Sequence, residues 1–343
     1  MRGPVRAVTF VACAWLLGAE RPASAAPADP PAGLPQYRLA LDVRPAESVV
    51  HFRQTVTWTN RRGGPTDVIL FNFYPHYQIP DGEEFLLAKT LELLRMNPRS
   101  GIDRKGRHGT VDRILLHKPG GKDPTPVAYS YRTENATTLR VDLPFRVEKG
   151  QSVTLELTGS VTLPPKQGRW GQWDGVSYFT NALPLVAYHD AEGWHDTPFV
   201  PWHQPFWNEA GVYTARITLP TDQTLGCSAA VASEAAAGPG WKTVTTRPFV
   251  GRDFAVVCSA KYREHTGTVR LPDGRDVTVR CLAAPGHEFY AREIVRYVSE
   301  ALPVYSQWFG PFPYDQLTIA ESYFGWNGNE CAGLVLIDER IFD

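Results

Sequence analysis

A carboxylate near the end of the chain, Glu330, has the surroundings of a ligand-binding group. It follows a run of small residues that includes Asn327, Gly328 and Asn329. Small residues let a backbone come close to a ligand. An apolar run at residues 334–337 then predicts a buried strand. The pattern predicts a loop at the edge of a strand, where a carboxylate can hold a ligand, but a polar turn before a core strand has the same pattern.

Histidine and acidic side chains also gather in an aromatic segment, residues 170–207, which holds five of the ten tryptophans. Three interpretations are open: a core or sheet-edge cluster, a sugar-stacking surface, or a metal site. His189 and His195 lie six positions apart with Gly193 between them, which matches no standard spacing of metal ligands. The histidine and acidic residues of the segment are His189, Asp190, Glu192, His195, Asp196 and His203, of which the histidines and aspartates are the candidates for a metal site.

The stretch around Glu330 resembles the substrate-anchoring motif of the M1 family of zinc aminopeptidases. That motif is G-x-M-E-N followed by a Gly-Leu-Ile-like strand. If the sequence GLV at residues 333–335 is matched to the strand, Glu330 takes the place of the motif's Glu, and Gly328 and Asn329 take the two positions before it. The resemblance is to a divergent branch. The departures are Asn327 for the leading Gly, Asn329 for Met and Cys331 for Asn.

Other segments are similar to the same family. Asn60 closes a predicted strand as in the family's β domain, and RDFA at residues 252–255 precedes the exit from that domain. The run at 309–321, which begins FGPFPY and ends LTIAE, resembles the opening of the catalytic domain. The sequence YHDAEGW at 188–194 stands where many members carry a proline-cysteine-acidic run. The resemblance covers roughly residues 37–343.

The resemblance implies an enzyme that hydrolyses the N-terminal residue from a peptide substrate with a free N-terminus. Glu330 would hold the substrate ammonium through a charge-assisted hydrogen bond. Backbone groups at Gly328 and Asn329 would flank the substrate residue. Zinc, expected for the full-length protein, would polarise the scissile carbonyl and lower the pKa of its water.

The zinc motif of such peptidases is H-E-x-x-H, in which two histidines one helical turn apart share the metal. His287 and Glu288 begin such a motif, but Ala291 stands at the position of the second histidine. We therefore expect the motif beyond residue 343, no catalytic or metal residue in this chain, and no activity of the chain alone. Two other functions stay open: a non-catalytic exported β-sandwich binding or scaffold protein, and an epoxide hydrolase that shares the M1 fold.

The expected fold is a mostly β N-terminal sandwich or saddle domain at residues 37–284, followed at 285–343 by the opening α/β part of a thermolysin-like catalytic domain. Short alternating runs with frequent turn signals favour the sandwich. A helix is expected at 85–96. Strands are expected at residues 37–43, 49–60, 68–74, 111–117, 127–131, 138–143, 152–158, 213–219, 243–246 and 254–259.

A second helix is expected after residue 286, ending near residue 309. Its apolar residues are spaced by four, four and three positions, which predicts one shared helical face. Those residues are Ile294, Val298, Leu302 and Tyr305. Between the first helix and the next strand, the polar segment 97–109 predicts a solvated loop. Its basic residues are Arg104, Lys105, Arg107 and His108.

The first 25 residues have the layout of a cleavable secretory signal: two arginines, an apolar run at 7–18, and Ala-Ser-Ala at 23–25. The apolar run is too short to span a bilayer comfortably, although an uncleaved anchor is the alternative. A linker follows at 27–36. We expect export to the periplasm or the extracellular space, and no membrane span after signal removal.

The chain carries 35 basic and 36 acidic residues, a balance that argues against nucleic acid as a partner. Export makes a disulfide possible. Cys227 and Cys258, both in predicted strands, could pair or remain as two buried thiols. Because no two cysteines have C-x-x-C spacing, a cysteine zinc site is not expected. Asn135 begins a glycosylation sequon, which has meaning only in a eukaryotic source.

Overall fold

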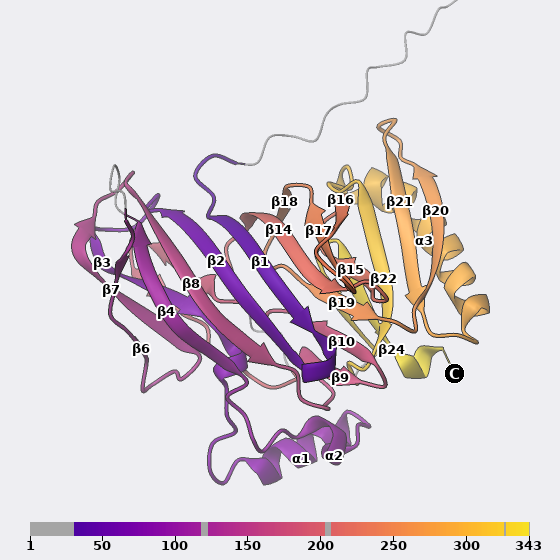
Figure 1. Ribbon diagram of the computed structural model, residues 1–343, viewed down its shortest axis with the longest axis horizontal. Helices are drawn as coiled ribbons and strands as arrows, with labels where there is room; N and C mark the ends of the chain where they lie inside the picture. Colours follow the sequence, from indigo (N-terminus) through magenta and orange to yellow (C-terminus); the bar gives the residue numbers. More distant parts are fainter. Residues whose placement is uncertain (1–30, 118–122, 203–206, 326, 343) are drawn as a thin grey trace, which may run out of the picture.

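The computed structural model describes most of the chain, namely residues 31–117, 123–202, 207–325 and 327–342. The predicted secretory signal and His203 lie outside these residues. Three sheets and a hairpin come first, and a smaller α/β unit closes the chain (Figure 1). In the described part, no helix is long and apolar enough to cross a membrane.

The largest sheet has nine strands. They are β1 (Gln36–Arg44), β2 (Val49–Thr59), β4 (Gly109–His117), β5 (Thr125–Pro126), β8 (Ser152–Thr162), β14 (Gly211–Pro220), β16 (Val231–Ala236), β17 (Trp241–Thr246) and β18 (Phe249–Gly251). Their order is β16-β17-β14-β1-β2-β8-β4-β5, with β18 also paired to β14. Buried and more exposed residues alternate along β1, β2 and β8, so one face of the sheet is covered.

A four-stranded antiparallel sheet covers that face. Its strands, in the order β11-β3-β7-β6, are β3 (Thr66–Asn72), β6 (Tyr129–Tyr131), β7 (Thr138–Val147) and β11 (Leu185–Val186). Phe71 and Leu139 from this sheet share one core with Phe52 and Leu157 from the larger sheet. The predicted sandwich is therefore confirmed.

The strand expected to reach residue 74 ends at Asn72 instead. Tyr74 begins a short 3-10 helix, η2 (Tyr74–His76). Pro75 explains the early end, because proline has no N–H to donate to a strand ladder. Two other 3-10 helices are η1 (Pro45–Glu47) and η3 (Glu339–Ile341).

A third sheet lies between the sandwich and the end of the chain. Its strands, in the order β15-β19-β10-β9, are β9 (Trp170–Trp173), β10 (Val176–Phe179), β15 (Thr224–Cys227) and β19 (Val256–Ser259). Cys227 and Cys258 are buried in this sheet as free thiols, so they do not form a disulfide. Burial raises the pKa of Cys227 to about 11 and that of Cys258 to about 12. A separate hairpin joins β12 (Tyr188–Asp190) and β13 (Gly193–His195).

The helix predicted at 85–96 is α1 (Glu84–Leu93), and a single turn, α2 (Pro98–Gly101), follows it. Both project from one end of the sandwich (Figure 1). Arg104 in the following loop forms an ion pair with Glu84. His108 was predicted to be solvated and is instead buried. Its ring bonds the Thr162 hydroxyl at 2.7 Å and the Asp103 carboxylate, so it anchors the loop.

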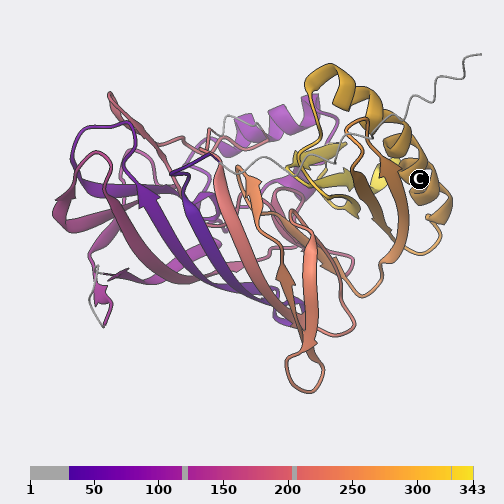
Figure 2. The same cartoon turned by 90° about the horizontal axis from the view of Figure 1, so that it is seen from above.

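Five strands and one long helix close the chain. They are β20 (Arg263–Arg270), β21 (Asp276–Ala283), α3 (Glu288–Phe309), β22 (Gln316–Ser322), β23 (Gly328–Cys331) and β24 (Leu334–Asp338). The sheet order is β20-β21-β22-β24-β23, and α3 connects the parallel strands β21 and β22. Figure 2 shows α3 lying across this sheet. The domain boundary predicted between residues 284 and 285 thus falls after β21 and before β22, which are neighbouring strands of this one sheet.

The second predicted helix is confirmed, and its predicted face packs against the sheet at all but one residue, Tyr305. Ala291, Val295 and Leu302 are buried against the sheet. Ile294 and Val298 are only partly buried, and Tyr305 is exposed. The spacing of the apolar residues therefore predicted the packed face, and the exception, Tyr305, lies near the end of the helix.

Candidate functional site

Glu330 lies on an edge strand, not in the loop that the small residues predicted. It belongs to β23, which pairs antiparallel with β24 at the end of the five-stranded sheet. The small residues form the turns on either side: Asn327 and Gly333 have φ angles of 47° and 74°. A Cβ at position 333 would lie 2.0 Å from the carbonyl oxygen of Ser228, so only glycine fits there.

Side chains alternate along a strand, so neighbouring residues of β23 face different surroundings. Glu330 is exposed, while Asn329 is 1% exposed. Asn329 accepts a hydrogen bond from Arg169 Nη1 at 3.0 Å and donates one to Thr180 Oγ1 at 2.8 Å. Its side chain is therefore held inside the protein. Gly328, which was predicted to flank the substrate with Asn329, is half-buried at the start of the strand.

A buried polar network supports β23 from behind. Arg169 Nη1 also donates to Asn181 Oδ1 at 3.2 Å. The backbone N and Nδ2 of Asn181 donate to Asp253 Oδ2 at 3.2 and 3.0 Å, and the Cys331 thiol bonds the same carboxylate. Burial raises the pKa of Asp253 and lowers that of Arg169. Buried charges need such partners, so the network fixes the position of the strand that carries Glu330.

A cavity of about 380 Å³ opens beside β23. This volume is in the range of about 300–1,000 Å³ that is common for small-ligand sites. Tyr314, between α3 and β22, donates its hydroxyl proton to the carbonyl oxygen of Val250 at 3.0 Å and so closes one side. The polar or charged residues of the lining are Arg169, Asn181, Asn208, Arg252, Asp253, Tyr314, Asn329 and Glu330. The arrangement suits a small polar ligand with a cationic group near Glu330.

The aromatic segment forms packing contacts around its histidines. The His189 ring lies 5.6 Å from the Trp58 ring and 4.5 Å from the Trp194 ring. Trp194 packs against the sandwich core, as a core cluster would. His195 Nε2 lies 2.8 Å from Asp190 Oδ1. Within the ranges that the structure describes, no three potential metal ligands come together, and the candidate His203 lies outside those ranges.

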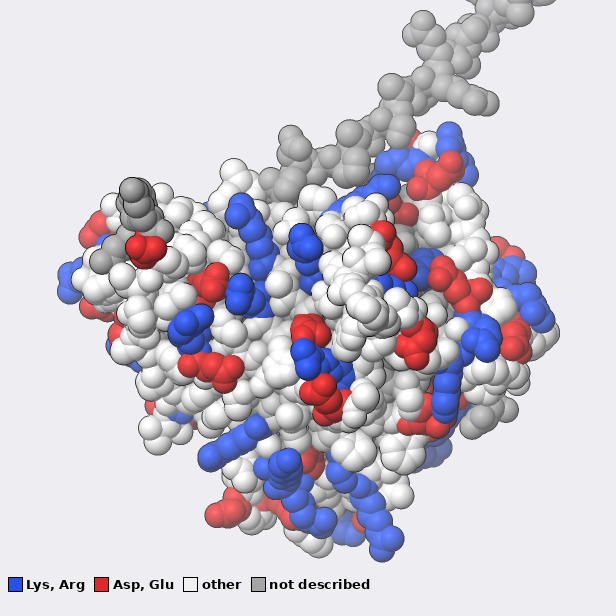
Figure 3. Space-filling view, viewed as in Figure 1, with Lys and Arg blue, Asp and Glu red and all other residues white. Residues whose placement is uncertain are grey.

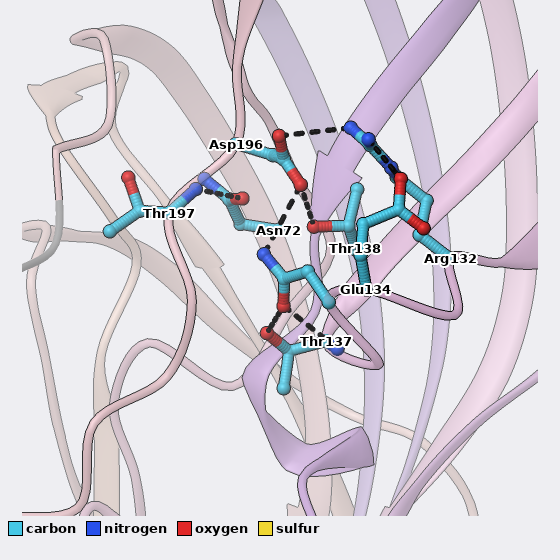
Figure 4. Close-up of polar contacts among 8 residues, drawn as sticks. Asn72, Arg132, Glu134, Thr137, Thr138, Asp196 and Thr197 are labelled. Atoms are coloured by element: carbon cyan, nitrogen blue, oxygen red, sulfur yellow. Dashed lines mark hydrogen bonds and ion pairs between the residues drawn. The ribbon is translucent and has the colours of Figure 1, made fainter.

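Asp196, another metal candidate, lies in a hydrogen-bond network that ties two loops together (Figure 4). Its carboxylate accepts from Arg132 Nη1 at 3.1 Å, Asn135 Nδ2 at 3.1 Å and Thr138 Oγ1 at 2.6 Å. Asn135 Oδ1 accepts in turn from the Thr137 hydroxyl at 2.8 Å. The sequon asparagine therefore has both ends of its amide bonded, and Asp196 has a structural role.

No family model and no curated protein matches this chain. Solved structures do match it. The M1 zinc metallopeptidase from Deinococcus radiodurans has 21% sequence identity and a TM-score of 0.56, covering 89% of this chain and 60% of that one. A mutant of that peptidase bound to a Tyr-Ser-Ala substrate has 20% identity, a TM-score of 0.57 and the same two coverages. A two-domain M1 zinc metallopeptidase mutant bound to L-arginine has 20% identity and a TM-score of 0.57, covering 90% and 60%.

The fold is M1-like. At this identity the match shows the fold and no more, and the chain spans about 60% of the length of these structures. The predicted fold class is confirmed, because the mostly β part and the α/β part together correspond to the N-terminal portion of M1 metallopeptidase structures.

Sequence reasoning missed most of the support around Glu330. Asp253 lies in the RDFA run that resembles the family, although that run gave no hint of a contact with β23. Arg169 lies 160 positions before Asn329 in the chain, and Asn181 lies 148 positions before it. Nothing in the sequence around either residue distinguishes it. Only the packing of the third sheet against β23 brings these side chains together.

Proposed function

We propose that this chain is the N-terminal, substrate-anchoring part of an exported zinc-dependent aminopeptidase, which removes N-terminal residues from peptides. The observation that carries the proposal is the exposed Glu330 on an edge strand at a polar cavity. Structures with the same fold have been solved with a Tyr-Ser-Ala substrate and with L-tryptophan, which supports a peptide or its N-terminal residue as the ligand.

Glu330 would bind the free ammonium of the substrate. A carboxylate and an ammonium at contact distance form a charge-assisted hydrogen bond, which is stronger than a neutral one. Residues inside a peptide chain have no ammonium, so this contact would restrict cleavage to the N-terminus. The outer edge of β23 offers backbone groups with which an extended peptide can pair as an added strand.

Zinc, when bound, would polarise the scissile carbonyl and supply an activated water. Since no three ligands come together in the described ranges, the chemistry assigned to these residues is peptide binding alone. In this proposal the zinc motif lies beyond residue 343.

The exposed apolar surface of α3 supports the proposal that a further part of the protein packs there. Tyr297, Trp308 and Phe309 are 59%, 70% and 80% exposed. Exposed apolar surface of this extent on one helix is typical of an interaction surface. The compared structures are also longer than this chain.

Export is proposed from the first 25 residues alone, whose layout is that of a secretory signal. Mass spectrometry of the protein recovered from the exported fraction tests it. A mature N-terminus close to Ala25 is expected, and an intact Met1 in the exported protein would contradict export with cleavage.

A non-catalytic binding module is the second candidate. One observation favours it: Trp207 is 44% exposed, and its ring lies 4.1 Å from the ring of Tyr188. Paired, partly exposed aromatic rings can stack on sugars or other flat ligands. This function would leave Glu330 without a role.

The test uses the full-length gene product. Hydrolysis of alanine and leucine p-nitroanilides is measured beside the N-acetylated forms, before and after zinc is removed with a chelator. Hydrolysis confined to the unblocked substrates and restored by zinc is the expected result. A zinc-free protein with no hydrolysis of either form would favour the binding module.

A further inference from the structure

The cavity beside β23 is lined by charged residues of both signs. Four charged residues from the described part of the chain line it: Arg169 and Arg252 are positive, and Asp253 and Glu330 are negative. In their ionised forms, these two positive and two negative side chains have a net charge of zero. Figure 3 shows that positive and negative residues are interspersed over the face in that view. The charge that a ligand meets in the cavity is therefore set by the residues that line the cavity.

A bound N-terminus would change this balance. This step rests on the proposed function, in which Glu330 pairs with the substrate ammonium. Among the described charged residues of the lining, Asp253 is then the remaining negative side chain beside Arg169 and Arg252. Asp253 already bonds Asn181 and Cys331, and burial raises its pKa, so titration can only remove negative charge from it. The side-chain part of the cavity would carry an excess of one positive charge.

Arg252 is placed to use that excess. It is exposed, and its Nη1 donates to the carbonyl oxygen of Asn208 at 3.2 Å, which holds the guanidinium at the cavity. A guanidinium has five N–H donors in a planar fork that fits a carboxylate. Arg169, in contrast, is bound into the network by Asn181 and Asn329, so it contributes charge from a fixed position.

We propose that this cavity receives the side chain of the substrate's N-terminal residue and selects an acidic one, glutamate or aspartate. The acidic side chain pairs with Arg252 and restores neutrality. A neutral side chain leaves one positive charge without a counterion, and a lysine or arginine side chain adds a second. Arg252 is therefore the residue that determines specificity.

The first test measures kcat/KM of the full-length enzyme on glutamyl, glutaminyl and lysyl p-nitroanilides. Glutamate and glutamine have nearly the same shape, so their ratio isolates the charge. A charge-assisted contact predicts a preference of about ten-fold or more for glutamate. Arg252→Gln should remove the preference, and Arg252→Glu should turn it toward lysine. Arg216→Gln, an exposed arginine on β14, makes the same charge change and should leave the preference intact.

The second test measures binding of L-glutamate, L-glutamine and L-lysine to the 343-residue chain by calorimetry. Glutamate should bind about ten-fold more tightly than glutamine, and Arg252→Gln should abolish the difference. Hydrolysis without a glutamate preference would overturn this inference and leave the proposed function standing. No hydrolysis, with glutamate binding that depends on Arg252, would support the acidic site and overturn the proposed function. Equal binding of all three amino acids would overturn the site.

Discussion

The sandwich core and the region behind β23 are held together by different forces. The core joins two sheets through apolar side chains such as Phe52, Phe71 and Leu157. The region behind β23 is built from buried polar groups, among them Arg169 and Asp253. Apolar burial is non-directional and tolerates small shifts, whereas buried hydrogen bonds and charges require one arrangement. The directional contacts therefore lie where they fix the position of β23, the strand that carries Glu330.

The largest effect is expected in the core. Phe71→Ala removes a fully buried ring, and such truncations cost about 3–5 kcal/mol of the free energy of unfolding. Urea denaturation measures the loss, with Phe85→Ala as the control because Phe85 is 73% exposed. The control should change stability by less than about 0.5 kcal/mol. A loss of similar size in both variants would contradict the placement of the core.

A smaller effect is expected behind β23. Asn329→Met introduces the residue of the family motif but removes the amide oxygen that accepts from Arg169 Nη1 and the amide group that donates to Thr180 Oγ1. Unsatisfied buried polar groups cost about 1–3 kcal/mol each. Denaturation of this variant, and of the same change in a Thr180→Val background, forms a double-mutant cycle. A smaller cost in the Thr180→Val background is expected, and fully additive costs would exclude the Asn329–Thr180 contact.

The free energy of unfolding should depend on pH through the buried polar region, which contains Asp253, and not through the apolar core. Burial raises the pKa of Asp253 above its ordinary value of 3.8. For an acid with a raised folded-state pKa, the stabilising contribution is complete below pH 3.8 and is lost as the pH rises through the folded-state value. The stability of the wild type relative to Asp253→Asn should therefore fall with rising pH in this window. Denaturation curves over a pH series test this, and a difference that grows with pH would contradict it.

The same contrast explains what the sequence could predict. Apolar alternation at residues 37–43 and 49–60 located β1 and β2, and the spacing within 286–309 located α3. These are local periodicities. Residues 328–331 read as a loop because small residues are typical of turns, while the pairing with β24 that makes them a strand is a tertiary contact.

The supporting residues of the site could not be predicted for a related reason. His108 looked solvated within a basic run, yet its partner Thr162 lies 54 positions away. Arg169 reaches Asn329 over 160 positions. A single sequence records no such pairing, whereas Glu330 could be predicted as a site residue because a short contiguous motif surrounds it.

The central claim is that Glu330 on the edge of β23 binds the free N-terminus of a peptide. The decisive measurement is kcat/KM of full-length wild type and Glu330→Gln on unblocked and N-acetylated alanine p-nitroanilide. Glu330 is exposed, so stability should be nearly unchanged. Loss of a charge-assisted contact of about 1.5–3 kcal/mol predicts a fall of roughly ten- to a hundred-fold on the unblocked substrate, with negligible activity on the blocked one. An unchanged kcat/KM on the unblocked substrate would contradict the claim.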